Sequence, residues 1–393
     1  MKRYDVVIIG AGLAGLQCAR LLGEKGARVL LADRKASLSD AIHTTGVFVR
    51  RTLEDFDFPS ECLGSAFRHV SLYSPARREL RLESKHDEFR IGRMARLYEH
   101  YLKQCRNAGV EWAPATRYVG LENDSMESIV QFETGATRWA AGTRYLVGGD
   151  GARSRVARGL SLDLNSEWIV GVEEVFSGVP FDGPPRFHCF LDPVVAPGYL
   201  AWVIHDGQET HVGVGGYATR FDPLRALESF RQSVDGKIVD LRHANCSERR
   251  GGRIPVGGVL LRIANERGLL IGDAAGAVSP LTAGGLDPCM RLSSLAAHVI
   301  GEYLASGNSA MLSAYSGEAF RAKFTSRLWM RRIISELKHP LLLEAACGVM
   351  RLPLFKSLAW HVFFGRGSFP VATGTVGVSS AAGTVGVSPA ASA

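Results

Sequence analysis

The sequence contains no pair of closely spaced cysteines. Its seven cysteines lie far apart in a chain of 393 residues, and no CxxC motif occurs. An odd number of isolated cysteines indicates neither a disulfide framework nor a zinc site. Because such usage fits a reducing compartment, we expect a cytoplasmic protein with no bound metal, whose core is held by side-chain packing alone.

Long hydrophobic runs are also missing. A transmembrane helix needs about 18 or more consecutive apolar residues, and polar or helix-breaking residues divide the most apolar stretch, 340–364. The dividing residues are Glu344, Arg351, Pro353 and Lys356. The apolar run after Met1 resembles a secretion signal, but glycines interrupt it. We therefore expect no transmembrane helix.

Acidic residues are scarce in one region near the end of the chain. Between residues 315 and 370 there are nine basic and three acidic residues, which accounts for most of the net charge of +7. Basic clusters indicate nucleic acid or an anionic membrane surface, and no nucleic-acid-binding motif accompanies this one. Peripheral membrane contact and an apolar pocket wall with a solvated basic face explain the region equally well. The sequence leaves the oligomeric state open.

The last segment, 371–393, has no charged residue. Apart from Pro389 it consists of glycine, serine, alanine, threonine and valine. A segment of this composition cannot bury enough apolar surface to fold. We predict a disordered low-complexity tail without a site.

The N-terminus carries a β-α-β pattern. An apolar run at 5–9 leads into a glycine turn at 10–15, a helical pattern follows to residue 26, and a second apolar run at 29–32 ends at Asp33. Strand, glycine turn, helix and terminal acid come in the order of a dinucleotide-binding unit.

Each residue type in this unit suits a diphosphate. Gly10 and Gly12 leave the backbone free to approach the phosphates, and Gly15 lets the helix pack on the strand. The helix N-terminus offers unpaired N–H groups and a partial positive charge, while the carboxylate of Asp33 can accept hydrogen bonds from a ribose. The predicted contacts also include Leu13, Ala14 and Arg34. This motif alone does not separate FAD from NAD.

Two later motifs resemble those of one family. Residues 148–158, GGDGARSRVAR, resemble the "DG" motif of p-hydroxybenzoate-hydroxylase-type flavoproteins, and residues 268–280, GLLIGDAAGAVSP, resemble their "GD" motif. The order and spacing of the three motifs match as well. The resemblance covers about residues 1–365 and implies that the cofactor is FAD.

The resemblance also implies the fold. We expect an α/β protein in which a Rossmann-like FAD-binding domain of this type carries an inserted antiparallel β-sheet, followed by a helical C-terminal region. The expected boundaries are 1–65, 86–165 and 250–310 for the FAD-binding domain, 66–85 and 166–249 for the substrate domain, and 311–370 for the helical region.

Further FAD contacts follow from the resemblance. Asp273 is expected to bond the ribityl hydroxyls, and the turn at Gly284 and Gly285 to let main chain approach the flavin ring. Asp150 is expected near FAD and the reductant, and Arg93 near the FAD phosphates. The alternative role is a helix cap for Asp273, a structural loop acid for Asp150 and an exposed surface arginine for Arg93. The remaining predicted contacts are Val119, Gly151, Gly272, Pro280 and Leu286.

One branch of the superfamily fits best. Residues 280–286, PLTAGGL, are similar to the PLTGGGI of the geranylgeranyl reductase family. Residues 199–205, YLAWVIH, match its YxWxFP motif at Trp202 but carry His205 in place of Pro; two positions also match the WxWxIP of flavin-dependent halogenases.

The family's C-A-E-G element beside the flavin corresponds to residues 43–46 of this chain. His43 replaces the cysteine, and the resemblance implies that Thr44 and Gly46 contact the flavin through their backbone. The predicted catalytic residues are His43, Trp202 and His205. A structural histidine is the alternative for His43, and a pocket wall or core residue the alternative for Trp202.

The resemblance implies hydride transfer from FADH2 to a carbon–carbon double bond of an isoprenoid or other hydrophobic substrate. No second glycine-rich nicotinamide domain is visible, so NAD(P)H would visit the flavin transiently or a ferredoxin-like donor would replace it. A monooxygenase or halogenase using O2, and a redox-neutral flavoprotein such as a lycopene-cyclase-like enzyme, are the alternatives.

Overall fold

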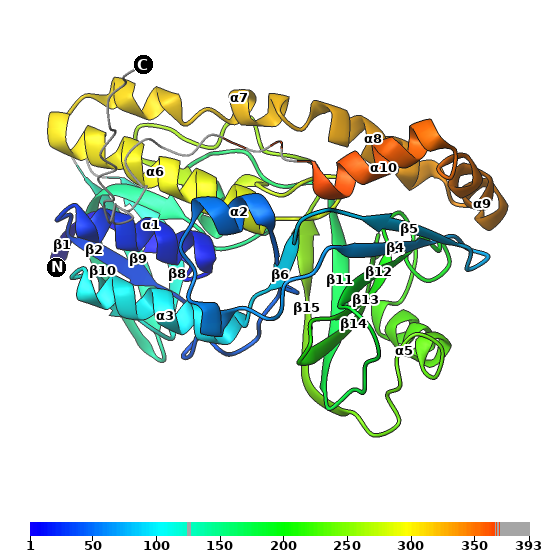
Figure 1. Ribbon diagram of the computed structural model, residues 1–393. Helices are drawn as coiled ribbons and strands as arrows, with labels where there is room; N and C mark the ends of the chain where they lie inside the picture. Colours follow the sequence, from blue (N-terminus) through cyan, green and yellow to red (C-terminus); the bar gives the residue numbers. More distant parts are fainter. Residues whose placement is uncertain (124–126, 366, 368, 370–393) are drawn as a thin grey trace, which may run out of the picture.

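The computed structural model describes residues 1–123, 127–365, 367 and 369. These residues form two seven-stranded sheets and one two-stranded sheet. Figure 1 shows the first large sheet on the left, the second on the right, and the C-terminal helices running along the top from one to the other. The predicted α/β class with an inserted second sheet is confirmed.

The first sheet has a parallel centre. It consists of β7 (Glu111–Ala113), β2 (Val29–Ala32), β1 (Lys2–Ile9), β10 (Thr137–Gly148) and β16 (Gly268–Leu270), all parallel. All four residues of β2 are buried, and a parallel strand buried on both faces reads as a continuous apolar run. The carboxyl ends of these strands meet at one edge, where ligand sites form in such sheets.

The first half of β10 has a different neighbour. It pairs antiparallel with β9 (Ser128–Thr134), which in turn pairs with β8 (Thr116–Asn123). Helix α1 (Leu13–Glu24) packs between α3 (Met94–Asn107) and α6 (Leu286–Ser306). A short helix, α4 (Arg155–Gly159), follows β10.

The second sheet joins distant parts of the chain. Its order is β15 (Asn245–Pro255), β11 (Trp168–Ser177), β14 (Glu209–Gly216), β13 (Ala201–His205), β12 (Arg186–Phe190), β4 (His69–Tyr73) and β5 (Glu79–Glu83). All its pairings are antiparallel except β12 with β4, since β4 enters from the first domain. Strand β15 continues past the boundary expected at residue 249, and α5 (Pro223–Val234) packs on β14 and β11.

Small elements connect the two sheets. Strands β3 (Val47–Val49) and β6 (Phe89–Ile91) form the two-stranded sheet, and α2 (Arg50–Asp55) follows β3. The described 3-10 turns are Ser60–Cys62, Gly272–Ala275 and Ser309–Ala314.

The C-terminal region is helical as predicted, with α7 (Gly317–Ala322), α8 (Thr325–Glu336), α9 (Pro340–Val349) and α10 (Pro353–Phe364). Proline at the first position of α9 and of α10 fixes a helical φ where no backbone donor is needed. Across the described part of the chain, no helix is both long and apolar enough to cross a bilayer. The predicted low-complexity tail, 371–393, lies outside the described residues.

Candidate functional site

A cavity of about 1140 Å³ lies between the two large sheets. Ligand pockets usually measure about 300–1,000 Å³, so this one has room for a large cofactor and a second ligand. Most of the residues predicted to bind a cofactor or to act in catalysis line it. They are Gly10, Gly12, Leu13, Ala14, Asp33, Arg34, His43, Thr44, Gly46, Asp150, Gly151, Trp202, Gly272, Asp273, Gly284, Gly285 and Leu286.

The three glycines of the turn after β1 have different structural roles. A Cβ on Gly12 would meet no protein atom within 4 Å, so this position opens onto the cavity. A Cβ on Gly10 would overlap the carbonyl of Gly149, and one on Gly15 would overlap the carbonyl of Gly10. Gly12 is therefore the glycine that a phosphate would need, whereas Gly10 is required by the approach of a neighbouring strand end rather than by the phosphates. Gly15 serves packing, as predicted.

The acid at the end of β2 braces this turn. The backbone N–H of Ala11 donates to Oδ2 of Asp33 at 2.7 Å, and that of Lys35 donates to Oδ1 at 2.8 Å. Each oxygen keeps a second lone pair, and the residue lines the cavity. Asp33 thus holds the glycine turn in shape and retains acceptor capacity for a ribose.

Asp273 differs from the other cavity acids in having no donor. Among the described residues no side chain or N–H reaches its carboxylate, and burial alone raises its pKa from 3.8 to about 6. A buried carboxylate without a hydrogen bond is unfavourable, so this group is suited to a ligand that supplies hydroxyl donors.

The carboxylate of Asp150, in contrast, accepts three hydrogen bonds from the protein. It accepts from the Ser154 hydroxyl at 2.6 Å and from the backbone N–H groups of Arg155 and Val156 at 2.7 and 3.2 Å. These groups belong to Ser154, the N-cap of α4, and to the first turn of that helix, so the Asp150 side chain supports the start of α4. Burial nevertheless raises its pKa. The geometry favours the structural alternative for Asp150, although its backbone and that of Gly151 still line the cavity.

Arg93 does not lie where the family resemblance places it. Its Nη1 donates to Asp206 at 2.6 Å and to Glu209 at 2.7 Å, and the side chain is 10% exposed and absent from the cavity lining. An arginine held between two carboxylates is not free to bind phosphates. The resemblance missed this because the acids come from the β13–β14 turn, which is distant in sequence.

We expect Arg93→Met to destabilise the fold without weakening cofactor binding. Loss of one partner from a buried ion pair costs about 3 kcal/mol, which denaturant unfolding would measure. Burial raises the pKa of Asp206, but the bond and charge of Arg93 outweigh it, so the net pKa is lowered. The difference in unfolding free energy between wild type and Arg93→Met is therefore largest at neutral pH and shrinks as acid protonates Asp206. Arg106→Met, on the exposed face of α3, is the control; a large loss of cofactor affinity at unchanged stability would contradict this assignment.

Three further predicted residues lie outside the lining. Val119 is 39% exposed on β8, and Pro280 is not among the lining residues although Ser279 and Leu281 beside it are. His205 is buried against Phe181, with ring centroids 4.2 Å apart. Burial lowers the pKa of His205, and the packing gives it a structural place rather than a catalytic one.

His43 and Trp202 both face the cavity. The Nδ1 of exposed His43 lies 2.9 Å from the carbonyl oxygen of Gly251, and the N–H of Gly46 donates to the Thr44 hydroxyl. The indole of Trp202 is buried and donates to Glu173 at 3.0 Å. Trp202 therefore acts as a pocket wall with a fixed orientation.

Sequence reasoning missed Glu173, which is 2% exposed, lines the cavity and lies in the middle of β11. Besides the indole it accepts from the Thr45 hydroxyl at 2.6 Å, and Arg250 lies 3.5 Å from its other oxygen. Two adjacent glutamates, Glu173 and Glu174, in a largely apolar strand were the available signal, since such residues are rarely buried without partners.

The other end of the cavity is apolar. Its walls come from the second sheet and the loop before β13, from β6, and from α8 and α10. They include Leu72, Phe89, Phe187, Tyr199, Leu200, Ile204, Met330, Ile334, Phe355, Leu358, Val362 and Phe363. The hydroxyl of Tyr199 donates to the carbonyl of Thr282 at 2.7 Å, which ties this wall to the turn that precedes α6.

Comparison with known proteins agrees with this geometry. The family model described as FAD binding domain matches residues 3–192. A digeranylgeranylglycerophospholipid reductase of Methanocella arvoryzae is 26% identical over 332 residues, covering 82% of this chain and 84% of the relative. A geranylgeranyl bacteriochlorophyll reductase-like structure from Thermoplasma acidophilum superposes with a TM-score of 0.80 at 19% identity, over 90% of this chain and 92% of that one.

These matches all fit the geranylgeranyl reductase-like group of FAD-dependent oxidoreductases. The fold is shared more widely, since p-nitrophenol 4-monooxygenase PnpA from Pseudomonas putida has a TM-score of 0.72 at 18% identity, over 93% of this chain and 100% of that one. Fold alone therefore does not choose between reduction and oxygenation.

The residues present fit FAD. The open position at Gly12 leaves space for the diphosphate at the N-terminus of α1, which begins without a side-chain cap. The donor-free Asp273 matches the hydroxyls of a ribityl chain. Helix α6 also begins uncapped, at Gly285 beside the cavity, so its positive end can stabilise negative charge on a reduced flavin ring. His43 stands where the C-A-E-G element of the resembling family has cysteine.

Proposed function

We propose that this protein reduces carbon–carbon double bonds of an isoprenoid lipid, with FAD as the hydride carrier. The observation that carries the proposal is the continuity of one cavity, whose first half has the flavin cradle and whose second half is walled by apolar side chains. The name of the Methanocella arvoryzae relative supports a prenyl-lipid substrate.

When bound and reduced, FAD supplies a hydride. The protein's part is to bind, orient and dry the alkene. The apolar walls exclude water and hold a prenyl chain in one orientation. The entropy cost of aligning the alkene is therefore met on binding and does not add to the barrier of the chemical step. The bond from Tyr199 to Thr282 fixes the turn between lipid and flavin ends.

An anaerobic incubation tests the proposal. Enzyme reduced with dithionite is mixed with a polyprenyl lipid, and the products are analysed by mass spectrometry. We expect a mass gain of two hydrogens per double bond without O2. A product that forms only with oxygen, or only with oxygen and halide, would instead indicate a monooxygenase or halogenase; conversion without a change in mass would indicate a redox-neutral enzyme.

The electron donor is part of the proposal. NAD(P)H visiting the flavin, or a ferredoxin-like protein, would restore the reduced cofactor. Stopped-flow reduction of the flavin by each candidate under anaerobic conditions distinguishes the two.

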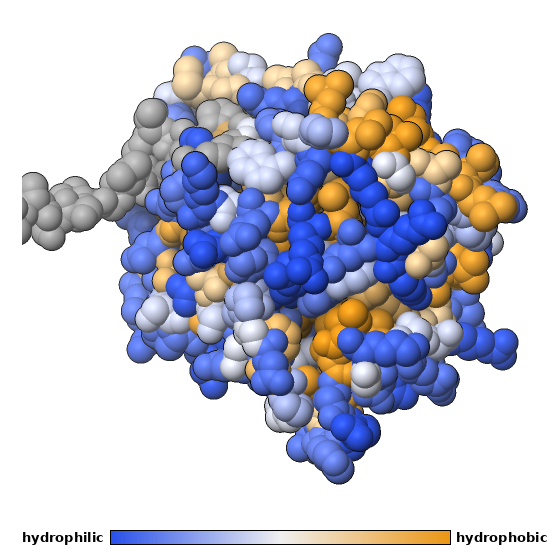
Figure 2. All heavy atoms as spheres, turned by 45° about the vertical axis from the view of Figure 1, so that its right-hand side comes forward, coloured by the Kyte–Doolittle hydropathy of each residue, from blue (hydrophilic) through white to orange (hydrophobic). Residues whose placement is uncertain are grey.

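We also propose that the enzyme meets its lipid at a membrane surface. Helices α9 and α10 expose large apolar side chains, and Figure 2 shows hydrophobic residues gathered over this part of the molecule. Leu354 is 78%, Leu341 73% and Leu342 60% exposed. Leu358 and Phe355 are both exposed and line the cavity, so this α9–α10 patch is continuous with the lipid end of the site.

The charges around the patch match an anionic bilayer. Lys338 and Lys356 are exposed, and Arg351 is partly exposed. Basic residues beside an apolar helix face are typical of interfacial attachment.

We expect the double variant Leu342→Glu/Leu354→Glu to bind anionic vesicles at least about 10-fold more weakly, because each leucine inserted contributes about 1.5–3 kcal/mol. Co-sedimentation with phosphatidylglycerol vesicles measures this. Leu224→Glu, at a leucine 58% exposed on α5, should bind as the wild type does. Equal binding of all three proteins would contradict the membrane proposal and leave the reductase proposal standing.

A further inference from the structure

We propose that a buried chain of side chains, Thr45, Glu173, His211 and Glu209, delivers the proton that completes alkene reduction. This inference rests on the proposed function, which requires one proton for every hydride. It assigns a role to groups that the cofactor and the lipid walls leave unused.

The chain runs from the cavity to the surface. The Thr45 hydroxyl, which lines the cavity, lies 2.6 Å from Oε2 of Glu173. Oε1 of Glu173 lies 3.5 Å from Nδ1 of His211, and Nε2 of His211 lies 3.7 Å from Oε2 of Glu209. The side chain of Glu209 is 29% exposed, so it provides contact with solvent.

His211 is the decisive link. It is completely buried, and within the described residues neither ring nitrogen has a hydrogen-bond partner. Oε1 of Glu173 is buried and unbonded in the same way. A buried imidazole with a carboxylate near each nitrogen can take a proton on one side and release it on the other. Thermal displacements of about 0.5 Å are enough to bring each gap to hydrogen-bond length.

Other charged groups surround His211 and contribute to the electrostatic potential at its ring. These are Glu173 on β11, Glu209 on β14, Arg250 on β15, and His205 and Asp206 before the β13–β14 turn. Burial raises the pKa of Glu173, but the neighbouring His211 and the charge of Arg250 outweigh it and the net pKa is lowered. Glu173 therefore holds a proton only in transit.

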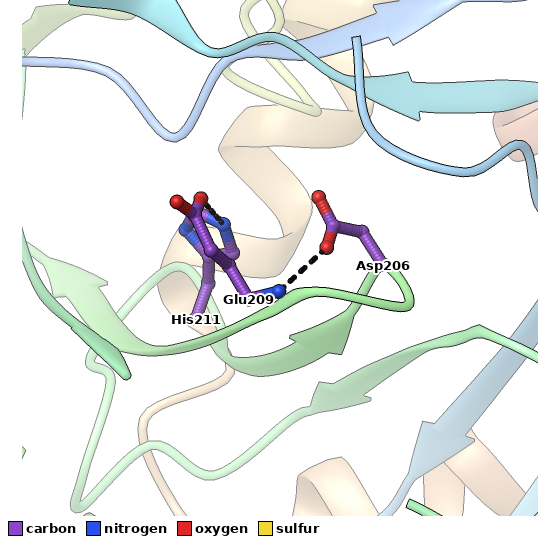
Figure 3. Close-up of side chains that lie close together, drawn as sticks. All are labelled: Asp206, Glu209 and His211. Carbon is purple, nitrogen blue, oxygen red and sulfur yellow. Dashed lines mark hydrogen bonds and ion pairs between the residues drawn. The ribbon is translucent and has the colours of Figure 1, made fainter. Parts of the chain in front are cut away.

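A metal ion is not needed to explain this cluster. Figure 3 shows the side chains of Asp206, Glu209 and His211, with ligand atoms within 4.8 Å of one another. The guanidinium of Arg93 already lies between the two carboxylates, at 2.6 and 2.7 Å, and supplies the positive charge there. Arg93 thereby holds Glu209 in place beside the histidine.

The transfer balances in atoms and electrons. The double bond loses its π bond and gains two C–H bonds; the two electrons and one hydrogen come as hydride from the reduced cofactor, which the NAD(P)H or ferredoxin-like donor regenerates. The second hydrogen is a proton. His211 passes a proton to Glu173, Glu173 passes it to the Thr45 oxygen, and the Thr45 hydroxyl gives its own proton to the substrate carbon. Water returns a proton to His211 through Glu209.

The first test is kinetic. Oxidation of pre-reduced enzyme by a polyprenyl lipid is followed anaerobically, as flavin absorbance against pH. Because general acid catalysis contributes about 10²–10⁴-fold, we expect His211→Gln to slow this step at least about 10-fold and to remove its pH dependence. His188→Gln, on the same sheet outside the cavity lining, should match the wild type. A His211→Gln variant with wild-type rate and pH profile would overturn the proposal.

The second test needs neither substrate nor turnover. Histidine ring ¹⁵N–¹H spectra of the intact protein are recorded against pH, with the His211 signals assigned by their loss in His211→Gln or, where that variant fails to fold, from Glu209→Gln. We expect Glu209→Gln and Glu173→Gln each to shift the His211 titration and to leave that of His188 unchanged. An insensitive His211 would overturn the relay. Should the wild type reduce no alkene, the proposed function fails, and this titration still decides whether the linkage exists.

Discussion

Replacement of Gly12 by valine should abolish FAD binding and leave the apoprotein as stable as the wild type. The position is extended, with φ −70° and ψ 176°, which valine adopts readily, and a Cβ there meets no protein atom within 4 Å. The new side chain would occupy the space where the diphosphate approaches the start of α1. We expect a loss of at least about 100-fold in affinity, equivalent to about 2.8 kcal/mol, measured by titrating FAD into apoprotein.

The matched control is Gly120→Val. Gly120 also has no atom within 4 Å of an added Cβ, but it lies on β8 outside the cavity lining, so both FAD affinity and stability should stay unchanged. Gly10→Ala should behave in the opposite way and unfold the protein, because its Cβ overlaps the Gly149 carbonyl. FAD binding by Gly12→Val with wild-type affinity would show that the diphosphate lies elsewhere.

Much of the fold could be predicted from local pattern. The β-α-β unit is recognisable because apolar strand, glycine turn and terminal acid lie within about 30 residues of sequence, the size of such a unit. The later turns at Asp150 and Asp273 could be predicted in the same way. Prediction of their roles was less complete, since Asp150 supports the start of α4 and only Asp273 is left without a donor.

Contacts between distant segments were the part that the sequence did not reveal. Arg93 follows β6, yet its partners lie at the β13–β14 turn. Glu173 and Thr45 are likewise joined only when the second sheet packs against the flavin domain. No periodicity or spacing indicates such pairings. The resemblance therefore placed Arg93 beside the FAD phosphates, whereas the structure pairs it with Asp206 and Glu209.

Replacement of Asp273 by asparagine should stabilise the apoprotein while weakening FAD binding. Burial raises the pKa of this carboxyl from 3.8 to about 6, so above that pH the folded protein carries an unpaired, half-buried charge. A shift of this size corresponds to at most about 3 kcal/mol. The folded state binds the extra proton, so stability is full below the unfolded pKa and falls as pH rises through 6. Asparagine should therefore raise the free energy of unfolding at about pH 7.5 and change it little at about pH 4.

For FAD affinity we expect the opposite order, with the wild type binding more tightly than Asp273→Asn. Hydroxyl donors of the ribityl chain favour the ionised acid, so wild-type affinity should fall as pH drops through 6, whereas Asp273→Asn should bind at least about 10-fold more weakly at neutral pH with little pH dependence. Asp33→Asn is the informative comparison, because that carboxylate already accepts two backbone N–H bonds and its loss should lower apoprotein stability instead. An Asp273→Asn protein with unchanged unfolding energy at both pH values would mean that the carboxylate is solvated in the free enzyme, and its assignment to the flavin side chain would then have no physical basis.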